Sequence, residues 1–251
     1  MKSNKEALQQ RGFIGDIDIS LYLDISEKDL LKYLNSQVAT ERSIAAKIIA
    51  LKKDATFIDH LVNALSKETK LYSKIAISES LSQLGIQAVK ALIPFLGKIG
   101  NNQYKTLPSE QFLKNNYPLP RDIVARTICK IGSKAISILI KEFSSLQKNI
   151  HQTEIPNHSA ELNQLSEAID AIGYISYYTK NISAKEYLLK LLDQYKENSL
   201  ITWKLIRALQ SFPDKDVIKY LKNIINSTTI KQHKWEAQRS LDKITEAKKL
   251  L

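Results

Sequence analysis

The side chains that could bind a metal ion are few, and their spacing is unfavourable. His151, Glu154 and His158 lie close together, but their spacing matches no standard zinc pattern and no fourth ligand lies nearby. An acidic group near the amino terminus consists of Asp16, Asp18 and Asp24. Its spacing is more typical of an exposed turn or a helix cap than of a cation site. We therefore predict neither a bound metal nor a cofactor.

Nucleophilic catalysis finds equally little support. The single cysteine, Cys129, follows the apolar residue Ile128 and has no histidine near it in the sequence. With 7 glycines in 251 residues, the chain contains no glycine-rich phosphate loop. We expect a protein that is not an enzyme.

One aromatic–cationic pair could bind a base or another planar group. Trp203 and Arg207 are one helical turn apart, and an exposed pair of this kind permits cation–π contacts or stacking. Because Trp203 lies close to an apolar face and no Asp or Glu occurs in residues 201–211, we predict instead that Trp203 packs in the core.

Net charge is the one extreme feature of the composition. The chain carries a formal charge of +11, and residues 90–148 contain 10 Lys/Arg against 3 Asp/Glu. Such an excess can attract a nucleic acid or an acidic protein. However, 31 of the 37 basic residues are lysine, whereas sequence-specific nucleic-acid readers favour arginine. Both a phosphate-binding surface and an ordinary solvated surface remain open.

The elements that carry these residues are helices, because one apolar spacing recurs six times. Residues at i, i+4 and i+7 lie on one face of a helix. We call the six predicted segments the A helices. Their apolar residues are Ile44, Ile48, Leu51; Ile77, Leu81, Leu84; Val124, Ile128, Ile131; Leu165, Ile169, Ile172; Thr202, Ile206, Leu209; and Ala237, Leu241, Ile244.

Each A helix except the last is followed by a second periodic segment with adjacent apolar residues one turn apart, which we call a B helix. A further B-like segment around Leu30–Leu34 precedes the first A helix. Gly85, Gly132 and Gly173 follow A-helix patterns and predict helix ends with positive φ. Pro94 falls inside the second B pattern and should kink or end that helix. The last A helix is expected to cap the array, with these polar residues facing water: Lys234, Glu236, Arg239, Asp242 and Lys243.

This pairing, with small residues at Ala45, Ser78, Ala125 and Ser166 and the Leu-Gly or Ile-Gly junctions, resembles HEAT repeats. It is most similar to the bacterial phycobilisome-lyase-like subtype, although the Asp that commonly follows the Gly is missing. The resemblance implies an all-α fold, a short right-handed α-solenoid of about five to six helix pairs. We expect a single repeat domain over 1–251, with an N-terminal segment at 1–25, repeats at 26–245 and inserted loops at 97–120 and 147–160.

The first insertion interleaves basic, aromatic and proline residues, which makes it the favoured binding element. We nevertheless expect Leu107, Phe112 and Leu113 to form a short helix that covers the flank of the repeats. Basic residues of the third A helix, expected to be exposed, and of the B helices would extend the binding surface. The predicted partner-binding residues are Lys90, Lys98, Tyr104, Lys105, Lys114, Tyr117, Arg121, Arg126, Lys130, Lys134 and Lys141.

The HEAT resemblance implies that the protein docks a macromolecule, usually a protein, on a concave surface lined by the B helices. We therefore predict a cytoplasmic, non-catalytic binding or scaffold protein with no membrane association. The alternative is a nucleic-acid-binding protein that uses the basic 90–148 region. A catalytic form of this alternative would be similar to the HEAT-like DNA alkylation-repair glycosylases, which resemble this chain in fold and basic charge.

Overall fold

The computed structural model of the chain describes residues 4–15, 17–150 and 158–249. Within these ranges it contains 13 α-helices and no β-strand, which confirms the all-α fold class. The contacts group the chain into two compact units, unit 1 at residues 1–99 and unit 2 at residues 100–251. The boundary falls inside the first predicted insertion.

Unit 1 consists of short helices that alternate between the predicted A and B patterns. Its A helices are α3 (Ala39–Lys52) and α5 (Leu71–Leu84). Its B helices are α2 (Glu27–Leu34), α4 (Ile58–Lys67) and α6 (Ile86–Leu92). The remaining elements are α1 (Lys5–Gln9) and three 3-10 helices, Ile19–Tyr22, Ala55–Phe57 and Ile93–Phe95.

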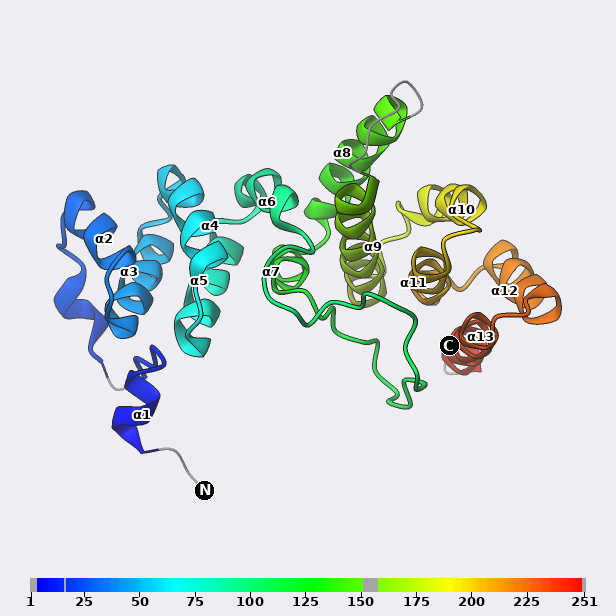
Figure 1. Cartoon of the computed structure of the whole chain (residues 1–251), viewed down its shortest axis with the longest axis horizontal. Helices are drawn as coiled ribbons and strands as arrows, with labels where there is room; N and C mark the ends of the chain where they lie inside the picture. The colour runs from blue at the N-terminus through cyan, green and yellow to red at the C-terminus, as the bar shows by residue number, and fades with distance from the viewer. Residues whose placement is uncertain (1–3, 16, 151–157, 250–251) are drawn as a thin grey trace. The chain divides into compact units, whose positions relative to one another are not determined.

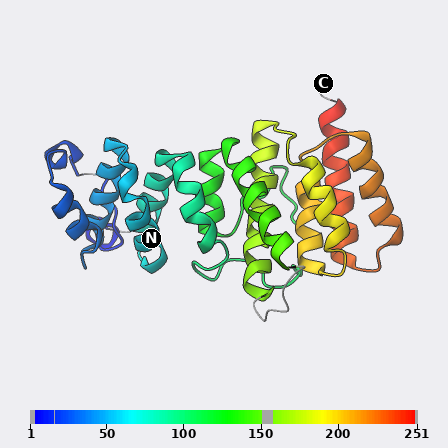
Figure 2. The ribbon, with the colours of Figure 1, turned by 90° about the horizontal axis from the view of Figure 1, so that it is seen from above.

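Unit 2 continues the alternation of A and B helices (Figures 1 and 2). Its A helices are α7 (Ile123–Ile131), α9 (His158–Thr179), α11 (Ser199–Leu209) and α13 (Lys231–Lys249). Its B helices are α8 (Lys134–Ile150), α10 (Lys185–Gln194) and α12 (Lys215–Ser227). The A helices pack on one another in sequence and form one row, and the B helices lie outside them in a second row (Figure 1).

Within each unit, side-chain hydrogen bonds link successive A helices at offsets of about one repeat. Ser73 and Ser80 of α5 donate hydrogen bonds to the carbonyls of Ala39 and Ala46 on α3, each at 2.7 Å and each 34 residues earlier. In unit 2, Ser240 of α13 donates to the carbonyl of Ile206 on α11, again 34 residues earlier. Small hydroxyl side chains therefore allow successive A helices to approach closely and satisfy the polar groups between them.

Several local predictions are confirmed and others are wrong. Gly85 and Gly132 end helices with φ of 72° and 89°. Pro94 ends α6, which passes into a 3-10 turn after Leu92. Gly173, in contrast, lies inside α9, where a Cβ would contact the Tyr117 hydroxyl and lie 2.9 Å from Ala208 Cβ. Its role is close packing and not a turn.

The two predicted insertions also differ from expectation. Residues 100–122 form an extended segment without helix, so the short helix expected around Leu107–Leu113 is absent. We call residues 100–122 the arm. The second insertion is shorter than predicted, because α8 continues to Ile150 and α9 begins at His158. His151 and Glu154 lie outside the described residues. In the part of the chain described, none of the helices has the length and apolar character needed to cross a bilayer.

Candidate functional site

The arm crosses the A row of unit 2 and is fixed to it at its carboxyl end (Figure 1). Tyr117, only 1% exposed, packs against the rings of Tyr174 and Tyr177 on α9, with centroids 6.1 and 5.1 Å away. Gln103 donates to the Asp122 carboxylate at 2.8 Å, and Asp122 caps α7. The arm is therefore an ordered cover over the A helices, although it has no regular structure of its own.

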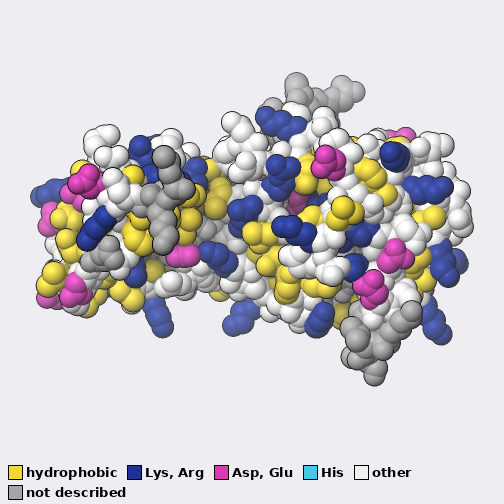
Figure 3. Space-filling view, turned by 90° about the horizontal axis from the view of Figure 1, so that it is seen from below, with side chains coloured by type: hydrophobic (Ala, Val, Ile, Leu, Met, Phe, Trp, Pro, Cys, Tyr) yellow, Lys and Arg dark blue, Asp and Glu magenta, His cyan; other side chains and the backbone are white. Residues whose placement is uncertain are grey.

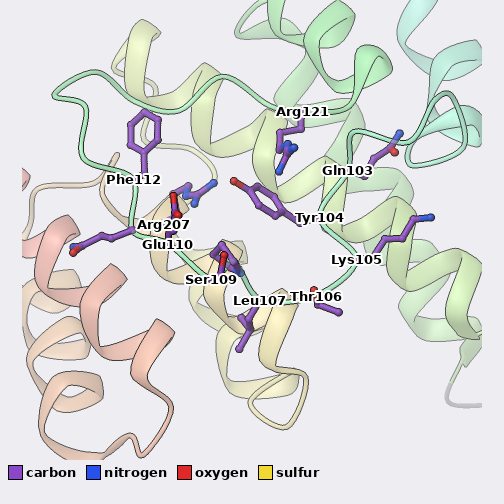
Figure 4. Close-up of a pocket in the computed structure, with 12 residues that line it drawn as sticks. Gln103, Tyr104, Lys105, Thr106, Leu107, Ser109, Glu110, Phe112, Arg121 and Arg207 are labelled. Carbon is purple, nitrogen blue, oxygen red and sulfur yellow. The ribbon is translucent and has the colours of Figure 1, made fainter.

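Between the arm and α11, two arginine side chains flank a pair of aromatic rings; Tyr104, Arg121 and Arg207 of this group are seen in Figure 4. The Arg121 guanidinium lies 4.5 Å from the Tyr104 centroid, and Tyr104 meets Trp203 edge-on with centroids 5.1 Å apart. The Arg207 guanidinium lies 3.8 Å from the Trp203 centroid and 5.9 Å from that of Tyr104. These contacts hold Arg207 in one place and bury Trp203, which is 1% exposed, as the sequence predicts.

The A row also contains a buried group of charges that links α9 to α11. Lys204 on α11 lies 2.7 Å from a Glu167 carboxylate oxygen and 2.8 Å from an Asp170 oxygen on α9. All three side chains are buried. Burial raises the pKa of Glu167 to about 7, against the lowering effect of Lys204. Burial alone would lower the pKa of Lys204, but attraction to Asp170 and Glu167 outweighs it and raises that pKa.

A second buried ionic group links α11 to α13. Glu236 on α13 lies 2.5 Å from Arg239 and 3.5 Å from Arg207 Nε, and all three side chains are buried. The capping prediction for the last helix requires Glu236 and Arg239 to face water. Both are buried instead, so this part of the prediction is wrong. They were expected at the surface because they lie off the apolar stripe, but the arm covers that side of α13: Phe112 approaches the Arg239 guanidinium at 5.7 Å.

These two groups contain carboxylates that a search along the sequence missed. No Asp or Glu lies near Trp203 in the chain, yet Asp170 and Glu236 reach its helix from the neighbouring A helices. The separations of Lys204 from Glu167 and of Arg207 from Asp170 are both 37 residues, about one repeat. Comparing charges at equivalent positions of successive A helices is the signal that could have revealed the cluster.

The surface between the arm and α11 is hollowed by a cavity of about 590 Å³. Six of its lining residues carry the chemistry: Tyr104, Lys105, Glu110, Phe112, Arg121 and Arg207. Three are cationic and only one is acidic. A cavity of this size, with aromatic walls and convergent polar groups, is typical of a small-ligand or side-chain-binding site.

The predicted partner-binding residues do not form a single surface within unit 2. Lys105, Lys114 and Arg121 are exposed on the arm, but Lys134 and Lys141 are exposed on α8 in the B row. Lys130 is exposed near the end of α7, and Lys90 and Lys98 belong to unit 1. Seen from the arm side, unit 2 shows more Lys and Arg than Asp and Glu, interspersed with apolar side chains (Figure 3).

Three predicted residues have other roles. Tyr117 is buried and anchors the arm, so it is inaccessible to a partner. Tyr104 is half-buried against Trp203. Arg126, expected to be exposed, is half-buried and donates through Nε to the Pro120 carbonyl. Moreover, the arm lies over the A helices, whereas the sequence reasoning placed the binding surface on the B helices.

Comparison with protein-family models, curated proteins and solved structures finds no significant match to this chain.

Proposed function

We propose that this chain is a cytoplasmic, non-catalytic HEAT-like repeat protein that docks a protein partner on the arm side of unit 2. In this proposal the A and B helices form about five to six HEAT-like pairs of a right-handed solenoid type. Hydroxyl-to-carbonyl hydrogen bonds at an offset of 34 residues between α3 and α5 and between α11 and α13, and of 38 residues from Ser211 to Gly173, support the repeat assignment.

The observation that carries the docking proposal is the burial of Arg207 and Arg239 against an ordered arm, with Arg207 lining an open cavity. Buried ion pairs contribute little net stability and are expensive to desolvate. Long irregular segments in compact domains are commonly binding elements. The arm also presents apolar surface, since Leu113 is 85% exposed, and protein interfaces combine such apolar residues with arginine and aromatic side chains.

Nucleic acid is the second candidate partner, favoured by the exposed Lys105, Lys114 and Arg121 on the arm. A glycosylase-like reaction has less support. Trp203 is covered by Tyr104 and so offers no free face for an extruded base. The nearby carboxylates of Asp170 and Glu236 are already paired with Lys204 and with Arg239 and Arg207.

Site-specific photo-crosslinking tests the proposal. A benzophenone side chain placed at Leu113 on the arm should give discrete protein adducts in an extract of the source cells. Leu21, 80% exposed in the 3-10 helix Ile19–Tyr22 of unit 1, provides the matched control position, because it is equally apolar and belongs to the other unit. Adducts that persist after nuclease treatment identify a protein partner.

Two results would contradict the proposal. Equal adducts from both positions would show that labelling follows exposed apolar surface and not the arm. Adducts from position 113 that disappear with nuclease would replace the protein partner with a nucleic acid.

A further inference from the structure

The cavity under the arm has an unbalanced charge. Lys105, Arg121 and Arg207 line it from the arm and from α11, and Glu110 is its only acidic lining residue. The rest of the wall is formed by uncharged arm residues, including the rings of Tyr104 and Phe112. An anionic group with an adjacent apolar part matches this lining.

Arg207 is the residue that makes this a built site and not a surface patch of lysines. Its side chain is 5% exposed, yet it lines the cavity. Its Nε makes no hydrogen bond to any described residue, although Glu236 lies 3.5 Å away. Trp203 holds the guanidinium plane in position. A guanidinium held in place beside an open cavity adds a fixed positive charge that an incoming anion can approach without reorganisation of the site.

We propose that this cavity receives a carboxylate side chain from an acidic segment of the protein partner, a proposal that rests on the docking function above. Arg121, exposed at the rim, meets the carboxylate with the two-pronged geometry that guanidinium groups favour, and Arg207 contributes from below. A neighbouring apolar or aromatic side chain of the same segment packs on Tyr104 and Phe112.

Three features favour a carboxylate over a phosphodiester backbone. Glu110 lies in the wall and repels a chain of closely spaced phosphates. Arg207 is partly neutralised by Glu236, so the site matches one negative charge better than several. The exposed cations Lys134 and Lys141 lie on α8 in the other row, and neither lines the cavity.

The test uses the full chain and three fluorescein-labelled probes. The first probe is a short peptide containing the run Glu-Phe-Glu, the second is the same peptide with Gln for Glu, and the third is oligo-dT of similar length. Fluorescence anisotropy should show saturable binding of the acidic peptide alone. Arg121→Gln should weaken that binding about tenfold or more. Lys141→Gln, which removes an exposed charge from α8, should leave it unchanged.

The other outcomes overturn the proposal in distinguishable ways. Oligo-dT binding that is lost in Arg121→Gln, without peptide binding, makes the cavity a phosphate site. If Arg121→Gln and Lys141→Gln weaken peptide binding equally, binding depends on the net charge of the protein and not on the cavity. No peptide binding at millimolar concentration, with arm crosslinks still present, removes the carboxylate claim and keeps protein docking. Loss of the arm crosslinks as well removes both.

Discussion

The two units use the same alternation of helices but join their A helices by different means. In unit 1, α3 and α5 meet through neutral hydroxyl groups, with Ser73 and Ser80 donating to backbone carbonyls of α3. In unit 2, α9, α11 and α13 meet through Lys204, Arg207 and their carboxylate partners. Unit 2 alone has the arm.

The difference indicates where this chain departs from what packing alone requires. Hydroxyl-to-carbonyl bonds satisfy the contact between two A helices with little desolvation, and unit 2 itself uses one at Ser240. Charged side chains cost much more free energy to bury than hydroxyl groups do. Removal of one partner from a buried ion pair is therefore strongly destabilising. We therefore interpret the buried charges between α9, α11 and α13, together with the arm, as parts of one site.

Removal of the lysine cation between α9 and α11 should have the largest effect on the stability of unit 2. Lys204→Met leaves the carboxylates of Glu167 and Asp170 buried without their cation, and we expect unit 2 to lose roughly 3–5 kcal/mol of unfolding free energy. Urea unfolding followed by tryptophan fluorescence measures this, because both tryptophans, Trp203 and Trp235, belong to unit 2. A change below about 1 kcal/mol would show that Glu167 and Asp170 do not depend on Lys204 to remain buried, and it would contradict the prediction.

The pH dependence of unit 2 should reveal Glu167. Its pKa in the folded protein is raised to about 7 from an ordinary value near 4.5, so the folded state holds a proton that the unfolded state has released. The stabilisation is therefore present below about pH 4.5 and is lost as pH rises towards 7. Relative to Glu167→Gln, the wild type should lose roughly 2 kcal/mol between pH 5 and 7.5. Parallel pH curves for the two proteins would contradict this assignment.

Gly173→Ala tests the packing of the arm against the A row. The new methyl group would contact the Tyr117 hydroxyl and Ala208, and we expect a loss of roughly 1–3 kcal/mol. This exceeds the gain of about 1 kcal/mol that alanine normally brings to a helix interior. A red shift of Trp203 emission in the folded protein would show that the arm has moved. A stabilised variant with unchanged emission would indicate that the arm does not press on α9.

The neutral contact of unit 1 should give the smallest effect. Ser80→Ala removes one hydrogen bond to the Ala46 carbonyl, and we expect a loss of about 1 kcal/mol confined to unit 1. Native-state hydrogen exchange of α3 and α5 measures it without a tryptophan in that unit. A loss comparable to that of Lys204→Met would remove the contrast between the two units.

The helices were predictable because each A helix repeats a 3.6-residue apolar stripe, which depends on local periodicity alone. Gly173 was misread as a helix end because a glycine that permits close packing looks the same in sequence as one that permits positive φ. The buried charges were missed for a different reason. A single-helix pattern assigns Glu236 and Arg239 to the solvent side, but Glu236 faces Arg207 of α11 and Arg239 lies against Phe112 of the arm.

The arm itself could be recognised only as an insertion rich in basic and aromatic residues. Its path over the A row depends on Tyr117 and on the Gln103–Asp122 hydrogen bond, contacts whose geometry leaves no periodic trace in the sequence. For the same reason the basic residues predicted as one surface are divided between the arm and α8.

The most direct test of the arm as a docking element is the emission of Trp203. In a Trp235→Phe variant, Trp203 is the only tryptophan, and it lies in edge-on contact with Tyr104 at the cavity wall. Titration with the unlabelled Glu-Phe-Glu peptide at constant ionic strength should change this emission saturably, and the Gln peptide should not. No change with the acidic peptide, while anisotropy still reports binding, would place the peptide elsewhere and contradict the account.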